Sequence, residues 1–198
     1  MLPRLVEATC GQRDLDRWRE RAVAGLSGAV LELGFGSGLN VHLYPPEVTT
    51  VFAVEPSGVA RQRSASRIAA SGASVEFVGL DGAQVPLADD SCDAALCTFT
   101  LCTIPDADAA LAEVRRIVRP GGTFHFLEHG EAPDAGVRRW QHRLDGVQQR
   151  LAGGCHLTRD PTTLVTAAGL ELVEVERRYV RGPKPWTWFS VGRAVVPA

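Results

Sequence analysis

Residues 29–38 read AVLELGFGSG, a short apolar run that leads directly into a turn with glycine at positions 34, 36 and 38. The run has the length and apolar content of a buried β-strand. The glycines Gly34, Gly36 and Gly38 let the backbone bend sharply and approach a ligand without a Cβ in the way. In an open α/β sheet, ligands bind outside the carboxyl ends of the strands. This segment therefore predicts the first strand of such a sheet, with a ligand site at its end.

The rest of the chain alternates strand patterns with helical patterns, which is typical of a parallel sheet covered by helices on both faces. We expect further strands at residues 51–54, 75–78, 93–98, 123–127, 171–179 and 188–195. Helices are expected at residues 13–25, from about 39, from 56 to about 70, and at 107–118, 134–152 and 161–168. The last two strands are joined by a turn too short for a helical crossover, so they should pair antiparallel. The predicted fold is α/β and Rossmann-like, a seven-stranded, mostly parallel sheet that ends in an antiparallel hairpin.

Length and charge limit the classes of function. The 198 residues fit a single domain, residues 1–198, in which residues 1–25 supply an N-terminal helix. The formal net charge of -2 gives no basic surface for a nucleic-acid partner. The sequence has neither the apolar run of a signal peptide nor the ~20 apolar residues of a membrane span, so we expect a cytoplasmic protein without an integral membrane segment.

The five cysteines are scattered along the chain, and their number is odd. Both features argue against a disulfide framework. No pair has CxxC spacing, so we expect no metal site and interpret the cysteines as buried free thiols. They are Cys10, Cys92, Cys97, Cys102 and Cys155.

An acidic residue ends the second predicted strand. Glu55 lies 21 residues after Gly34, and a carboxylate there can accept hydrogen bonds from both hydroxyls of a ribose. We place the adjacent Pro56 against the same ligand. The glycine turn and Glu55 together favour a nucleoside.

The residue after the third glycine separates two kinds of nucleoside ligand. The dinucleotide fingerprint G-x-G-x-x-G/A needs a small residue at position 39, but this chain has Leu39 there. The pattern thus disfavours a nicotinamide oxidoreductase and suits adenosine that carries an amino-acid tail. Glu32 fits this ligand, because a carboxylate would repel pyrophosphate but attract an ammonium group. Asn40 is expected to support the cofactor turn.

Two further segments complete the predicted cofactor site. Asp81, in the loop after the third strand, can accept a hydrogen bond from the amine of adenine, while Gly82 or Ala83 offers a backbone N–H to a ring nitrogen. At the end of the fourth strand, the carbonyls between Thr98 and Leu101 should face the amino-acid tail.

Together these motifs resemble the class I S-adenosylmethionine-dependent methyltransferases related to the ubiquinone/menaquinone C-methyltransferases. The resemblance spans about residues 25–195 and includes the turn at 30–38, Glu55, Asp81 and the RPGG motif at 119–122. The segments 100–104, 126–129 and 153–160 are similar to a bacterial branch that resembles the membrane-associated thiol methyltransferases of animals. The resemblance implies that the chain binds S-adenosylmethionine, releases S-adenosylhomocysteine and methylates a small molecule.

The sequence contains fewer motifs for the methyl-acceptor site than for the cofactor site. His129, directly after the fifth strand, is the candidate general base, which is needed only if the acceptor must lose a proton. Residues 130–165 are expected to form a wall on the substrate side, where Trp140 and His156 join Cys102 in binding the acceptor.

Three functions remain open, and each is testable. The first is methyl transfer to a small molecule, with a thiol as the leading acceptor. The second is O- or C-methylation of a quinone precursor or natural product. The third is a non-catalytic partner subunit that binds the donor. Separately from its function, we expect the chain to form a homodimer.

Overall fold

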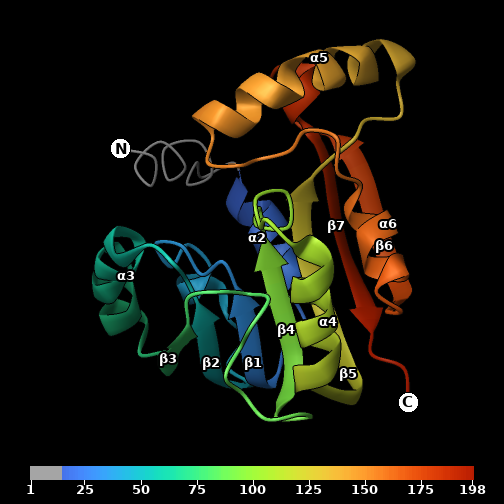
Figure 1. Ribbon diagram of the computed structural model, residues 1–198. Coiled ribbons are helices and arrows are strands. Elements are labelled where there is room, and N and C mark those ends of the chain that lie inside the picture. The colour runs from blue at the N-terminus through green and yellow to red at the C-terminus, as the bar shows by residue number, and fades with distance from the viewer. Residues whose placement is uncertain (1–14) are drawn as a thin grey trace.

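The computed structural model describes residues 15–198 and contains one seven-stranded sheet in the order β3-β2-β1-β4-β5-β7-β6 (Figure 1). The first five strands pair in parallel, whereas β7 is antiparallel to both β5 and β6. This arrangement confirms the predicted mixed sheet and its terminal hairpin. The strands are β1 (Gly28–Leu33), β2 (Val48–Val54), β3 (Val75–Gly79), β4 (Cys92–Thr98), β5 (Val118–His129), β6 (Glu171–Tyr179) and β7 (Trp188–Val195).

Three of the described helices begin where a polar side chain accepts a hydrogen bond from a free backbone N–H. Ser57 accepts a hydrogen bond from the N–H of Ala60 at the start of α3, and Asp106 accepts one from Ala109 at the start of α4. Asp160 caps α6, which has Pro161 in its first turn. The α-helices are α2 (Asp16–Val23), α3 (Gly58–Ser71), α4 (Ala107–Ile117), α5 (Ala135–Leu151) and α6 (Pro161–Ala167), and two short 3-10 helices are η2 (Val41–Leu43) and η3 (Lys184–Trp186).

The expected helix from about residue 39 is wrong. In its place, a compact turn leads into η2, and β2 begins at Val48. Pro45 and Pro46 explain this difference, since proline lacks a backbone N–H and disfavours helical geometry in the residue before it. The turn packs closely on α3, where a Cβ at Gly38 would come within 3.1 Å of Ser64.

Apolar side chains cover both faces of the sheet. On one face, Leu111 and Val114 of α4 pack against strand residues such as Phe124. On the other, Trp18 of α2 packs with a second cluster that includes Leu96. Strand β1 pairs with β2 on one side and with β4 on the other. The direction of the strand order therefore reverses at β1, and sheets of this kind bind ligands at such a switch point.

Two features frame the edge at this switch point. The fifth strand is longer than expected, because it starts at Val118 and extends through His129. Helix α5 lies across the top of the molecule in Figure 1, above the end toward which β4 points. Part of the predicted N-terminal helix, and also Cys10, lie outside the described residues. Between residues 15 and 198, no helix is both long and apolar enough to cross a bilayer.

Candidate functional site

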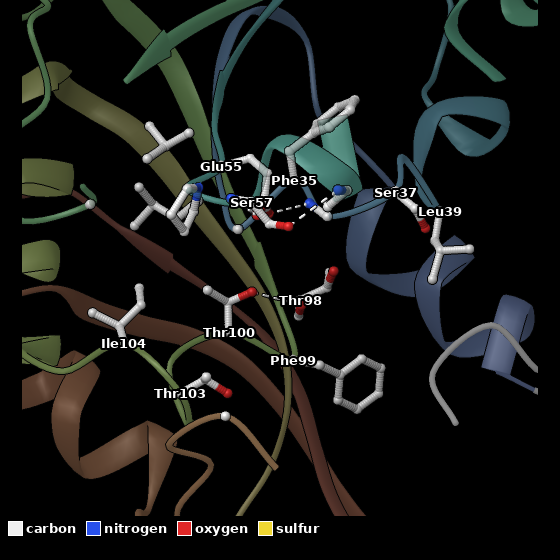
Figure 2. Close-up of a pocket in the computed structure, with 18 of the residues that line it drawn as sticks. Phe35, Ser37, Leu39, Glu55, Ser57, Thr98, Phe99, Thr100, Thr103 and Ile104 are labelled. Carbon is white, nitrogen blue, oxygen red and sulfur yellow. Dashed lines mark hydrogen bonds between the residues drawn. The ribbon is translucent and has the colours of Figure 1, made fainter. Parts of the chain in front are cut away.

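A cavity of about 420 Å³ lies at the carboxyl ends of β1, β2 and β4 (Figure 2). Its volume lies within the range of about 300–1,000 Å³ that is usual for small-molecule sites. Figure 2 shows Glu55 on one side of the cavity and Thr103 with Ile104 on the other. Eight predicted ligand-binding residues line it, namely Gly34, Gly36, Asn40, Glu55, Pro56, Asp81, Gly82 and Thr98.

The glycine turn forms one wall of the cavity, and each of its three positions requires glycine for a different structural reason. All three have positive φ, a backbone conformation that favours glycine. A Cβ at Gly34 would overlap the side chain of Thr100, whereas one at Gly36 would meet no atom closer than 3.9 Å. Gly34 and Gly38 thus permit close packing, and Gly36 leaves open space on the cavity side.

Glu55 holds this turn to the start of α3. Its Oε2 accepts a hydrogen bond from the N–H of Gly36 at 2.7 Å, and its Oε1 accepts one from Ser57 at 2.8 Å (Figure 2). The side chain is only 7% exposed, yet it lines the cavity. Each carboxylate oxygen has a second lone pair, so Glu55 can accept further hydrogen bonds from a ligand.

A buried polar network lies beside the turn. Asn40 donates to Glu32 at 2.7 Å and to the hydroxyl of Thr98 at 3.0 Å. Arg19 of α2 donates to Asn40 at 2.7 Å and to Thr98 at 3.1 Å, and Tyr44 donates to Glu32. The cavity wall includes Arg19, Asn40 and Thr98, but not Glu32. This part of the cavity wall therefore carries the positive charge of Arg19.

Burial controls the ionisation of this network. It raises the pKa of Glu32 to about 7, although hydrogen bonds from Tyr44 and Asn40 and the charge of Arg19 act in the opposite direction. Burial also raises the pKa of Tyr44, which keeps its hydroxyl protonated and able to donate to Glu32. At neutral pH, Glu32 is therefore close to its titration midpoint and sensitive to any charge that enters the cavity.

The adenine-side loop has a defined geometry. Asp81 is exposed, and its Oδ1 accepts a hydrogen bond from the N–H of Ala83 at 2.9 Å. Ala83 does not line the cavity, and its N–H is engaged in this turn. Of the two backbone groups considered for a ring nitrogen, Gly82 is therefore the better placed.

The opposite wall comes from the loop after β4 and the end of α5. Phe99 has a φ of 53°, an uncommon conformation for a residue other than glycine, and it lines the cavity. Buried Glu128 fixes this loop, since its Oε1 accepts hydrogen bonds from the N–H groups of Thr100 at 2.7 Å and Leu101 at 2.9 Å. From the segment expected to form the substrate-side wall, Ala152 and Gly153 reach the cavity.

Several predicted residues are not part of the cavity wall. Trp140 is 56% exposed on α5, with the guanidinium of Arg143 above its ring. His156 interacts with Gln149 at 3.0 Å. The predicted residues that do not line the cavity are Glu32, Gly38, Ala83, Leu101, Cys102, His129, Trp140 and His156.

Three residues of the cavity wall, Arg19, Thr103 and Gly153, were not among the predicted site residues. Arg19 lies on α2 and is only 3% exposed. An arginine on a helix gives no signal of its own for burial at a ligand site. The adjacent glycines Gly153 and Gly154 indicate a turn in the sequence, but the position of that turn relative to the cavity depends on how α5 packs.

Comparison with known proteins gives a consistent result. A family described as a methyltransferase domain matches residues 31–126. The thiol S-methyltransferase TMT1B of Homo sapiens is 32% identical over 180 residues, which cover 87% of this chain and 71% of that protein. The quinone-biosynthesis C-methyltransferase UbiE of Brucella anthropi is 32% identical over 144 residues, covering 69% of this chain and 52% of that protein. The chain spans 66–71% of the length of the thiol S-methyltransferases that it matches.

Solved structures agree at the level of the fold. A SAM-dependent methyltransferase from Methanosarcina mazei superposes with a TM-score of 0.62 at 18% identity, covering 86% of this chain and 93% of that one. At this identity the likeness shows a shared fold alone. That fold is the Rossmann-like arrangement expected from the sequence.

Proposed function

The chain belongs to the S-adenosylmethionine-dependent methyltransferases, as the sequence motifs predicted, and on that premise we propose that it methylates the sulfur of a small-molecule thiol. Human and rodent relatives that match most of the chain are named thiol S-methyltransferases. These names carry the choice of acceptor, and the cavity beside Glu55 carries the choice of donor, because a carboxylate, an open glycine and a buried arginine line the same space. These features fit a nucleoside with a charged amino-acid tail.

We place the donor by matching its polar groups to the cavity wall. Glu55 would accept hydrogen bonds from the ribose hydroxyls, while Asp81 and Gly82 would contact adenine. Arg19 would bind the carboxylate of the tail, because arginine and carboxylate form strong charge-assisted hydrogen bonds. The tail ammonium would lie toward Asn40 and Thr98, through which it would favour the ionised form of Glu32.

The donor supplies a methyl group that is already activated on a sulfonium, so the protein mainly has to position the acceptor. Holding two reactants in contact supplies on the order of 7–11 kcal/mol in favourable cases. The loop of Thr100 and Thr103 faces Glu55 across the cavity, and Glu128 fixes its backbone. A thiol with a pKa of about 8.5 is partly ionised at neutral pH and needs little help from a base.

Labelled methyl transfer tests this proposal. The protein is incubated with S-adenosylmethionine labelled on the methyl group and with matched thiols and phenols of similar size. We expect labelled thioethers, and we expect the Glu55→Gln variant to form them far more slowly. Labelled phenol ethers without thioethers would contradict the thiol assignment, and donor binding without any turnover would support a non-catalytic subunit.

A second candidate is methylation of a quinone precursor at carbon or oxygen, which the similarity to UbiE supports. A carbon acid or an alcohol needs a base, and His129 is the candidate, although it lies behind the cavity wall and would have to act through an intervening group. Only the quinone precursor needs a base, so the ratio of the two activities in one variant separates the functions. His129→Ala should remove activity on a quinone precursor by about 10²–10⁴-fold, the usual contribution of general acid–base catalysis.

A further inference from the structure

Three side chains with metal-binding atoms meet behind the acceptor-side wall. Cys102 follows β4, His129 ends β5, and Cys155 lies between α5 and α6. The Nε2 of His129 is 3.1 Å from the Sγ of Cys155, which is 3.8 Å from the Sγ of Cys102. All three atoms lie within 4.8 Å of one another. The expectation of no metal site rested on spacing along the chain, but the fold brings these residues together from distant segments.

The backbone holds this cluster in place without help from the three side chains. Gly153 and Gly154 both have positive φ, and they turn the chain after α5 so that Cys155 reaches Cys102. The N–H of His156 donates to the carbonyl of Cys102 at 2.8 Å. The two loops are thereby joined at the cluster itself.

A half-buried arginine, Arg159, adds a second connection between the same loops. Arg159 donates to the carbonyls of Leu101 at 2.7 Å and Ile104 at 2.6 Å. At the end of β5, the N–H of Glu131 donates to the carbonyl of Arg159 at 3.1 Å. All three segments that carry the cluster are therefore connected, which is the preorganisation that a ligand site requires.

The separation of the two sulfurs suits a tetrahedral ion with two thiolate ligands. Two thiolates bound to one Zn²⁺ at about 2.3 Å lie roughly 3.8 Å apart, and the two sulfurs of the cluster are separated by that distance. A disulfide would require them to approach to about 2.05 Å.

We propose that Cys102, His129 and Cys155 form a Zn²⁺ site with three protein ligands and a fourth position for water or another small ligand. Two S–H bonds break as two S–Zn bonds form, and both protons pass to the buffer. The ion would clamp the loop after β4, the end of β5 and the loop after α5. Because Thr103 and Gly153 line the cavity next to this clamp, bound zinc would fix the acceptor-side wall.

Metal titration of the whole protein tests this inference. Protein that has been reduced and treated with a chelator is titrated with Zn²⁺, and bound metal and thermal unfolding are measured. We expect one equivalent of zinc and a higher melting temperature. Cys102→Ser and Cys155→Ser should each weaken binding by more than the roughly 10–100-fold that loss of a second-shell partner costs, whereas Cys92→Ser removes a buried thiol elsewhere and should bind normally.

Co²⁺ provides a readout that does not depend on the variants. Bound to the wild-type protein, it should give a thiolate-to-cobalt charge-transfer band that Zn²⁺ abolishes. No band, no stoichiometric zinc, or equal loss in Cys92→Ser would overturn the site. Binding of S-adenosylhomocysteine should persist in Cys155→Ser, so failure of the metal site is distinguishable from failure of the donor site.

Discussion

Replacement of Glu55 by glutamine removes one acceptor oxygen and the charge while keeping the size of the side chain. The new NH₂ group would face either the N–H of Gly36 or that of Ser57, which now donate to the carboxylate at 2.7 and 2.8 Å. A hydrogen bond to a charged group contributes about 1.5–3 kcal/mol. The two hydrogen bonds from the ribose hydroxyls would each be weakened in the variant. Together this should weaken donor binding by about 3 kcal/mol, which is on the order of 100-fold in Kd.

Calorimetric titration with S-adenosylhomocysteine measures this change directly. Glu47→Gln is the matched control, because Glu47 is exposed before β2 and should leave affinity unchanged. Thermal melts of both variants separate weaker binding from loss of the fold. Wild-type affinity in a folded Glu55→Gln protein would refute the placement of the ribose.

Three further substitutions probe the glycine turn and the buried polar network beside it. The pKa of Glu32 is about 7 in the folded protein, above its ordinary value of 4.5. Between these two values the folded state holds a proton that the unfolded chain releases. The free energy of unfolding therefore falls as the pH rises from about 4.5 through about 7. Denaturant unfolding should therefore show Glu32→Gln gaining up to about 3 kcal/mol relative to wild type between pH 4.5 and 8, and a constant difference would contradict this. Gly36→Val should abolish donor binding in equilibrium dialysis while the protein remains folded, since the added side chain enters open space; retained binding would move the donor away from the turn. Gly34→Ala should lower the free energy of unfolding by at least about 2 kcal/mol, because its Cβ overlaps Thr100 at a positive φ, and an unchanged denaturant midpoint would argue against that contact.

The strands could be predicted because their signals are local. Apolar runs bounded by turn residues marked β1 and β4, and the short connection between β6 and β7 required a hairpin. The helix expected after the glycine turn failed because Pro45 and Pro46 limit the chain before β2. There, proline chemistry outweighed the general pattern of a strand, a turn and a helix.

The two halves of the candidate site differ in how far the sequence could define them. The glycine turn and Glu55 follow directly after neighbouring strands, so the parallel sheet alone brings them together. The opposite wall depends on how α5 packs, which leaves Trp140 exposed and brings Gly153 to the cavity. Cys102 and Cys155 are 53 residues apart, and no local pattern indicates that they meet.

A crystal structure of the protein with S-adenosylhomocysteine would test the central claim most directly. We predict that the ribose hydroxyls bind Glu55, that the carboxylate of the tail meets Arg19, and that the sulfur faces the loop of Thr100 and Thr103. A nucleoside bound outside this cavity, or a ribose that makes no contact with Glu55, would contradict the account.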